Sequence, residues 1–263
     1  MNPTKKRIEE IKKNGYDLDF ATVFNHAFEN YKKIALYGGL MIFVFSAIIC
    51  AIIAAILIAV FGVATLTDFL KPENLKPENF STSFTLIYMA IGVLITCLLS
   101  PFPAGLIKMA ECAEKDEEFH VSTVFEFYKA PYFKELFVAT LLISFLSQGI
   151  STLFEQSGIV LIGSLIAIAI SFLTLLTIPL IIFGNLKAVE AINSSITIVL
   201  KQPLVLLGLM AVAVIGMMVG FIGCCIGVFF TIPFLYSMYY VIYSTIIGTD
   251  SVSEIDEIGS SEN

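Results

Sequence analysis

The sequence predicts an all-α, polytopic membrane protein, and three observations support this. The chain is 57% hydrophobic and only 14% charged, with a mean hydropathy of +0.90, whereas roughly a quarter of the residues in soluble domains are charged. Its charge-free blocks are long enough for helices to cross a bilayer, and they lack the alternating pattern of a transmembrane barrel. Its basic residues also follow a topological pattern. At 263 residues, we expect a single integral membrane domain over 1–249.

Six spans follow from the charge-free blocks, because a bilayer core needs about 20 apolar residues per helix. The block 202–249 would make one helix of roughly 70 Å, so we expect it to turn back at the glycine-rich "GFIGCCIG". The predicted spans cover 34–64, 83–107, 136–154, 158–184, 203–221 and 225–247.

The basic residues predict the orientation of these spans. With six spans, thirteen of the 15 Lys and Arg residues fall on the side of the two termini, and Lys71 and Lys76 fall on the other side. Cytoplasmic loops retain basic residues, so we expect both termini in the cytoplasm. The basic, polar start of the chain is too long for the charged region of a signal peptide. The acidic tail 250–263 is poor in apolar residues and is expected to be disordered.

A repeated segment precedes two of the outgoing spans. "TVFNHAFENYKK" at 22–33 and "TVFEFYKAPYFK" at 123–134 share five of twelve positions, and 190–201 keeps a similar apolar pattern. Each ends in a lysine. The returning spans carry Pro101, Pro179 and Pro233, where we expect kinks. Three units are therefore expected, each with a surface helix, an outgoing span and a kinked returning span.

The repeated segments are predicted to be amphipathic helices on the inner leaflet. In 22–33, Val23, Phe24, Ala27, Phe28 and Tyr31 share a face, and Asn25, Glu29, Asn30 and Lys32 lie opposite. Tyr and Lys suit the headgroup region. Simple topological anchoring explains them, and a functional alternative is lipid-headgroup binding by the following set: Lys33, Lys134, Lys201, Tyr31 and Tyr132.

Two further features concern helix packing. Spans three and four carry mild polar residues that could line a groove for a transporter or flippase, or could form interhelical hydrogen bonds. These are Ser144, Gln148, Ser151, Ser171 and Thr174. Gly216 and Gly220 have the G-x-x-x-G spacing of close helix contact, either inside the chain or in a homo-oligomer. Since no charged residue lies within the six spans, ion-coupled transport is disfavoured.

Several segments resemble a known family. "PFPAGLIKMAE", "TIPLIIFGNLKAVEAINSSITIVLKQPLVLLGLMAV" and "GVFFTIPFLYSMYYVIY" look like bacterial six-span proteins related to the membrane domain of glycerophosphodiester phosphodiesterases. This resemblance implies a bacterial inner-membrane location and a fold of helix pairs, without the separate catalytic barrel. Some similar proteins carry a carotene oxygenase label. That chemistry needs four iron-binding His, and the chain has only His26 and His120.

Enzyme chemistry has little support, because no nucleophile, base and stabiliser converge in the pattern. The acidic run from Glu111 to Glu118, with His120, is expected to be a solvated linker, with a metal site as the alternative. We expect no cofactor, no metal and no nucleic-acid partner. The expected role is a non-enzymatic, lipid-interacting or scaffolding membrane protein with lipid or protein partners, and the alternative is a transporter or flippase.

Overall fold

All regular structure in the described part of the computed structural model is helical. The structure describes residues 2–71, 73–74, 81–156, 158–223 and 226–248. Its elements are α1 (Pro3–Asn14), α2 (Phe20–Phe61), α3 (Val63–Phe69), α4 (Thr82–Leu99), α5 (Pro101–Glu114), α6 (Val121–Val124), η2 (Glu126–Tyr128), α7 (Tyr132–Gln156), α8 (Val160–Leu173), α9 (Thr177–Ile182), α10 (Ala188–Val199), α11 (Pro203–Val219), η3 (Gly220–Gly223) and α12 (Gly227–Ile247).

The six predicted spans are confirmed as helices that are long and apolar enough to cross a membrane. They are Phe20–Phe61, Ser83–Glu114, Tyr132–Phe154, Val160–Ile182, Pro203–Ile222 and Gly227–Ile247. The predicted turn in 220–227 falls on η3, just before α12. The tail 250–263 and most of the "KPEN" repeat lie outside the described residues.

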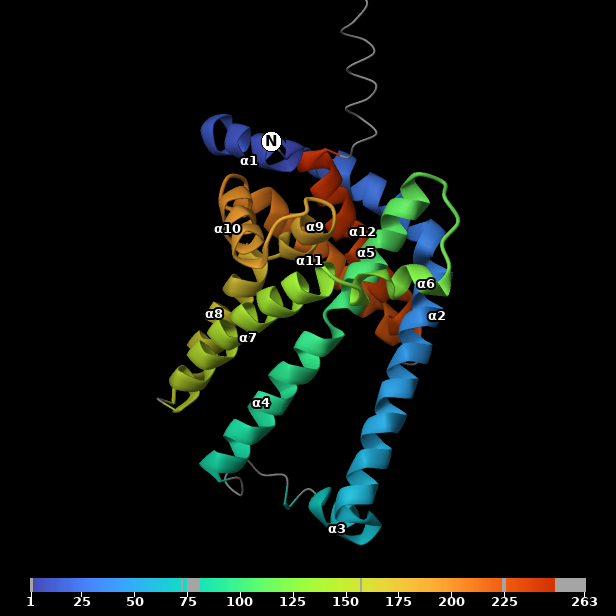
Figure 1. The fold of residues 1–263 in the computed structure, drawn as a ribbon, viewed down its shortest axis with the longest axis vertical. Coiled ribbons are helices and arrows are strands. Elements are labelled where there is room, and N and C mark those ends of the chain that lie inside the picture. The colour runs from blue at the N-terminus through green and yellow to red at the C-terminus, as the bar shows by residue number, and fades with distance from the viewer. Residues whose placement is uncertain (1, 72, 75–80, 157, 224–225, 249–263) are drawn as a thin grey trace, which may run out of the picture.

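The core lies at one end of the molecule, around α12. This helix packs against α1, α2, α5, α9 and α11, and α5 is buried along most of its length. In Figure 1 the elements α1, α5, α9, α10 and α12 gather at this end, and α2, α4 and α7 diverge as they extend away from it. We call it the packed end. Residues 50–61 of α2 are exposed on every side.

Helix α2 differs from the prediction, because 22–33 does not form a separate surface helix. The helix continues unbroken for 42 residues, about 63 Å at 1.5 Å per residue. Its apolar stripe is real, but much of it packs on protein. Phe24 and Phe28 both place their rings 6.1 Å from the ring of Phe234 in α12. A Cβ on Gly39 would lie 2.8 Å from the Phe230 Cα, so the two helices approach closely.

The other two segments take different forms. Residues 123–134 cover the end of the short α6 and all of η2, and α7 begins at Tyr132, directly after Pro131. Residues 190–201 lie mostly in the separate helix α10, which packs against α1, α7 and α9. Helix α4 packs against α7 and α5 and diverges from α2 in Figure 1. The internal repeat therefore stays a prediction from the sequence.

Candidate functional site

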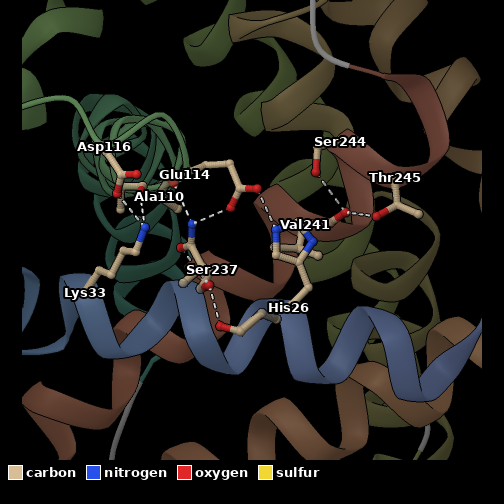
Figure 2. Close-up of polar contacts among 12 residues, drawn as sticks. His26, Lys33, Ala110, Glu114, Asp116, Ser237, Val241, Ser244 and Thr245 are labelled. Atoms are coloured by element: carbon tan, nitrogen blue, oxygen red, sulfur yellow. Dashed lines mark hydrogen bonds and ion pairs between the residues drawn. The ribbon is translucent and has the colours of Figure 1, made fainter. Parts of the chain in front are cut away.

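A polar cluster joins α2, α5 and α12 at the packed end. Its members are His26, Asn30 and Lys33 of α2, Glu114 of α5, Asp116 just after it, and Ser237 of α12. The three α2 residues have i, i+4 and i+7 spacing, which puts them on one face of a helix. Figure 2 shows Glu114 and Asp116 facing this side of α2. We call this set the polar cluster.

Asn30 is the centre of the polar cluster and is only 2% exposed. Its Nδ2 donates to the Ala110 carbonyl at 2.7 Å and to Glu114 Oε2 at 3.3 Å. Its Oδ1 accepts a hydrogen bond from Ser237 Oγ at 2.9 Å. Sequence reasoning placed Asn30 on the solvated face of an amphipathic helix, which is wrong. A polar group at this depth requires partners, and these come from two helices distant in sequence.

Two further side-chain pairs surround this buried amide. His26 Nε2 lies 2.7 Å from Glu114 Oε1. Lys33 Nζ donates to the Ala113 carbonyl at 2.9 Å and to Asp116 Oδ1 at 2.7 Å. A cation at the last carbonyls of α5 also complements the negative end of the helix dipole. The polar cluster therefore fixes α2 to the end of α5.

The acidic run is not simply a solvated linker. Glu111 is 7% exposed and pairs with Lys108 and Lys115 on the same helix. Glu111 and Glu114 both belong to α5. Among the described residues, no group of three or more His, Cys, Asp or Glu side chains could hold a metal ion. The contacts of the polar cluster are hydrogen bonds and ion pairs that join α2 to the end of α5 and to α12.

The predicted headgroup residues lie in different settings. Lys201 Nζ donates to the Lys12 carbonyl at 2.8 Å, so like Lys33 it has an internal partner. Lys134 is exposed, and no partner for its amine occurs in the described part of the chain. Tyr31 and Tyr132 donate to the Phe230 carbonyl at 3.1 Å and to Asn185 Oδ1 at 2.9 Å, respectively. The structure does not bring these five residues into one site.

The polar residues of α7 and α8 are partly engaged in the hairpin that these helices form. Ser151 Oγ donates to the Gly163 carbonyl at 3.2 Å, an interhelical bond. Thr174 donates within its own helical turn to the Ile170 carbonyl at 2.8 Å. Ser171 is exposed, and Ser144 and Gln148 are half-buried. The groove proposed for these residues stays a prediction.

The prolines lie at the start of a helix or inside one, and the glycines mark close contacts. Pro101 starts α5 directly after α4, Pro179 lies in the short α9 after α8 ends, and Pro233 lies inside α12. A Cβ on Gly216 would lie 2.9 Å from the Phe234 ring, and one on Gly220 would lie 2.6 Å from the Val228 backbone. The G-x-x-x-G pair therefore faces α12 of the same chain.

Helix α1 was not predicted from the sequence, although its signals are present. Asn2 caps its first turn, Pro3 opens it, and Gly15 ends it. Ile8 and Ile11 are buried beneath it. Asn2 Nδ2 donates to the Gly184 carbonyl at 2.7 Å, and Tyr16 Oη donates to the Ile198 carbonyl at 3.1 Å. Both ends of α1 are thus tied to the region around α10.

A pocket of about 470 Å³ lies between α1 and α10. Its lining is mostly polar: Lys5, Ile8, Glu9, Lys12, Lys187, Val189, Glu190, Asn193, Ser194 and Thr197. Lys5 Nζ bridges the two helices through Glu190 at 2.7 Å. We call it the α1–α10 pocket. No signal in the sequence identified it, because its walls come from segments about 180 residues apart.

Together, the helical fold and the six apolar helices define the class of protein, which is an all-α polytopic membrane protein. Comparisons of the chain with models of protein families, with curated proteins and with solved structures give no match. The resemblance to the membrane domain of glycerophosphodiester phosphodiesterases therefore stays a prediction based on the quoted segments.

Proposed function

We propose that this protein is a non-enzymatic membrane protein that binds lipid between and around its spread helices. The observation that supports this is the contrast between the packed end and the exposed apolar helices that diverge from it. Residues 50–61 of α2 are exposed on every side, and much of α4 and α8 is exposed as well. Apolar surface of this extent needs an apolar environment, and acyl chains provide one.

In this proposal the protein lies in a bacterial inner membrane, with both termini in the cytoplasm. Arg7 of α1 donates to the Ile246 carbonyl near the end of α12 at 3.1 Å, so the two ends of the described chain meet at the packed end. Most basic residues belong to this side, as the positive-inside rule requires. The polar cluster holds the helices together there, and their distal halves are left to the lipid.

The test uses the full-length protein purified in a mild detergent and examined by native mass spectrometry with added phosphatidylglycerol or phosphatidylcholine. We expect retained lipid, with a preference for the anionic phosphatidylglycerol that falls when Lys33, Lys134 and Lys201 are changed to Gln. Lys134 has the largest expected effect, because the other two amines have internal partners. Lys71→Gln, on the opposite side, is the matched control.

Two results would overturn the proposal. One is a purified protein that retains neither lipid under conditions where it keeps its fold. The other is substrate-dependent flux of a lipid or amphiphile across liposomes containing the protein, which would favour a transporter or flippase.

A further inference from the structure

The α1–α10 pocket has an excess of positive charge. Three amines line it, those of Lys5, Lys12 and Lys187, against the two carboxylates of Glu9 and Glu190. Lys12 lies 2.7 Å from Glu9 and holds the pKa of that carboxyl below its usual value. Both carboxylates are therefore already paired with lysines, and the lining has one positive charge in excess.

Lys187 provides this excess charge. It is exposed, and its amine has no hydrogen-bond or ion-pair partner in the part of the chain that the structure describes. Lys5 and Lys12 are engaged through Glu190 and Glu9. An anion entering the α1–α10 pocket would thus meet one amine that it does not have to compete for.

Ser194 provides a second polar group, whose hydroxyl has no partner within the described part of the protein. Ser194 is 7% exposed, yet it lines the pocket. Within the described residues its hydroxyl has no hydrogen-bond partner, whereas the adjacent Ser195 bonds to the Leu173 carbonyl and the Leu176 amide. The hydroxyl is not fully enclosed, since the enclosed side-chain atoms without a partner in the described residues are Thr177 Oγ1 and Gln202 Oε1, so Ser194 is open to a ligand. The Asn193 amide lines the same pocket and offers further donors.

The geometry points to the α1–α10 pocket as a binding site for a phosphate group, carried by a phospholipid headgroup or by a small soluble phosphate. The unpaired amine of Lys187 and the free hydroxyl of Ser194 suit an oxyanion with several acceptor oxygens. Ile8 and Val189 give the pocket an apolar wall, which suits the glycerol part of a lipid. The lipid source rests on the function proposed above, but the phosphate site itself does not.

The experiment measures binding to the full-length protein in detergent. One arm titrates phosphatidylglycerol by native mass spectrometry, and the other titrates inorganic phosphate and follows the melting temperature. We expect Lys187→Gln to weaken binding about tenfold, which corresponds to one charge-assisted contact, and Ser194→Ala to weaken it severalfold. Lys6→Gln is the matched control, because Lys6 is an exposed lysine of α1 that does not line the pocket.

Each outcome decides between the possibilities. Equal loss with Lys6→Gln and Lys187→Gln would mean general surface electrostatics and would overturn the site, as would a wild-type protein that responds to neither ligand. A response to inorganic phosphate alone that is lost in Lys187→Gln would keep the site and identify a soluble ligand. Lipid retention lost with Lys134→Gln but intact with Lys187→Gln, together with a phosphate response that Lys187→Gln leaves unchanged, would overturn this site and keep the proposed function.

Discussion

Replacing Asn30 with Ala should substantially destabilise the protein, because Asn30 connects three helices. The substitution removes the bonds to the Ala110 carbonyl, to Glu114 and from Ser237. At about 1 kcal/mol for each neutral bond, and somewhat more for one to a carboxylate, the expected loss is about 2 to 4 kcal/mol. Ser237 keeps its 2.7 Å bond to the Ala27 carbonyl, which limits the loss.

The assay is thermal unfolding of the purified protein in detergent. For a chain of this size, a loss of that magnitude corresponds to a decrease in melting temperature of about 5 to 10 °C. Asn25→Ala is the matched control, because Asn25 lies on the same helix and is exposed. Asn30→Asp should be worse than Asn30→Ala, since it places a second carboxylate beside Glu114.

Equal melting temperatures for Asn30→Ala and Asn25→Ala would refute this reasoning. Such a result would mean that Asn30 is not buried between the helices. Residues 22–33 would then lie along the membrane surface with Asn30 on the polar face, as the sequence pattern suggested.

Three other predictions concern packing and pH. Gly105→Ala should lower the free energy of unfolding by about 1 to 3 kcal/mol through overpacking, because the added Cβ would lie 2.0 Å from the Val124 carbonyl oxygen. Gly92→Ala is the control and should not destabilise α4, because nothing lies within 4 Å of its added Cβ. Similar melting temperatures for the two variants would contradict the packing of α5 on α6. Burial raises the pKa of Tyr16 to about 12, above the value near 10 of an unfolded tyrosine, so the contribution of Tyr16 to stability is complete below about pH 10 and declines from there to about pH 12. Between about pH 9 and 11 the melting temperature of Tyr16→Phe should therefore fall less than that of the wild type. Parallel curves for the two proteins would count against the burial of Tyr16. The Thr22 hydroxyl and amide lower the pKa of Asp19 at the start of α2, so the contribution of Asp19 to stability is present above about pH 4 and is lost as the pH falls further. The difference in melting temperature between the wild type and Asp19→Ala should therefore shrink on acidification. A difference that does not change with pH would argue against the cap.

The apolar stripe of 22–33 shows why sequence reasoning was only partly right about the site. The spacing of Val23, Ala27 and Tyr31 correctly indicated a helix with one apolar face. The pattern could not distinguish a face that meets lipid from one that meets α12, since both are apolar environments. Asn30 was misplaced for the same reason, because its partners Ala110 and Ser237 lie 80 and 207 residues away.

The pairing of Glu114 with His26 and of Lys33 with Asp116 was likewise not predictable. A run of acidic residues next to an apolar span resembles a solvated loop unless its partners are known. In contrast, the helix break at Pro131 follows from a missing amide hydrogen. The close helix contact at Gly220 follows from a missing side chain, and only the structure places this contact inside the chain.

The sequence by itself determined that this chain is all-α with six segments long and apolar enough to cross a membrane, because the length and polarity of each apolar segment can be compared directly with the thickness of a bilayer. Only the tertiary structure decided which faces meet protein, that the core lies at one end, and that α1 closes over α10. These features depend on contacts between residues far apart along the chain, and such contacts leave no periodic signal in the amino-acid order.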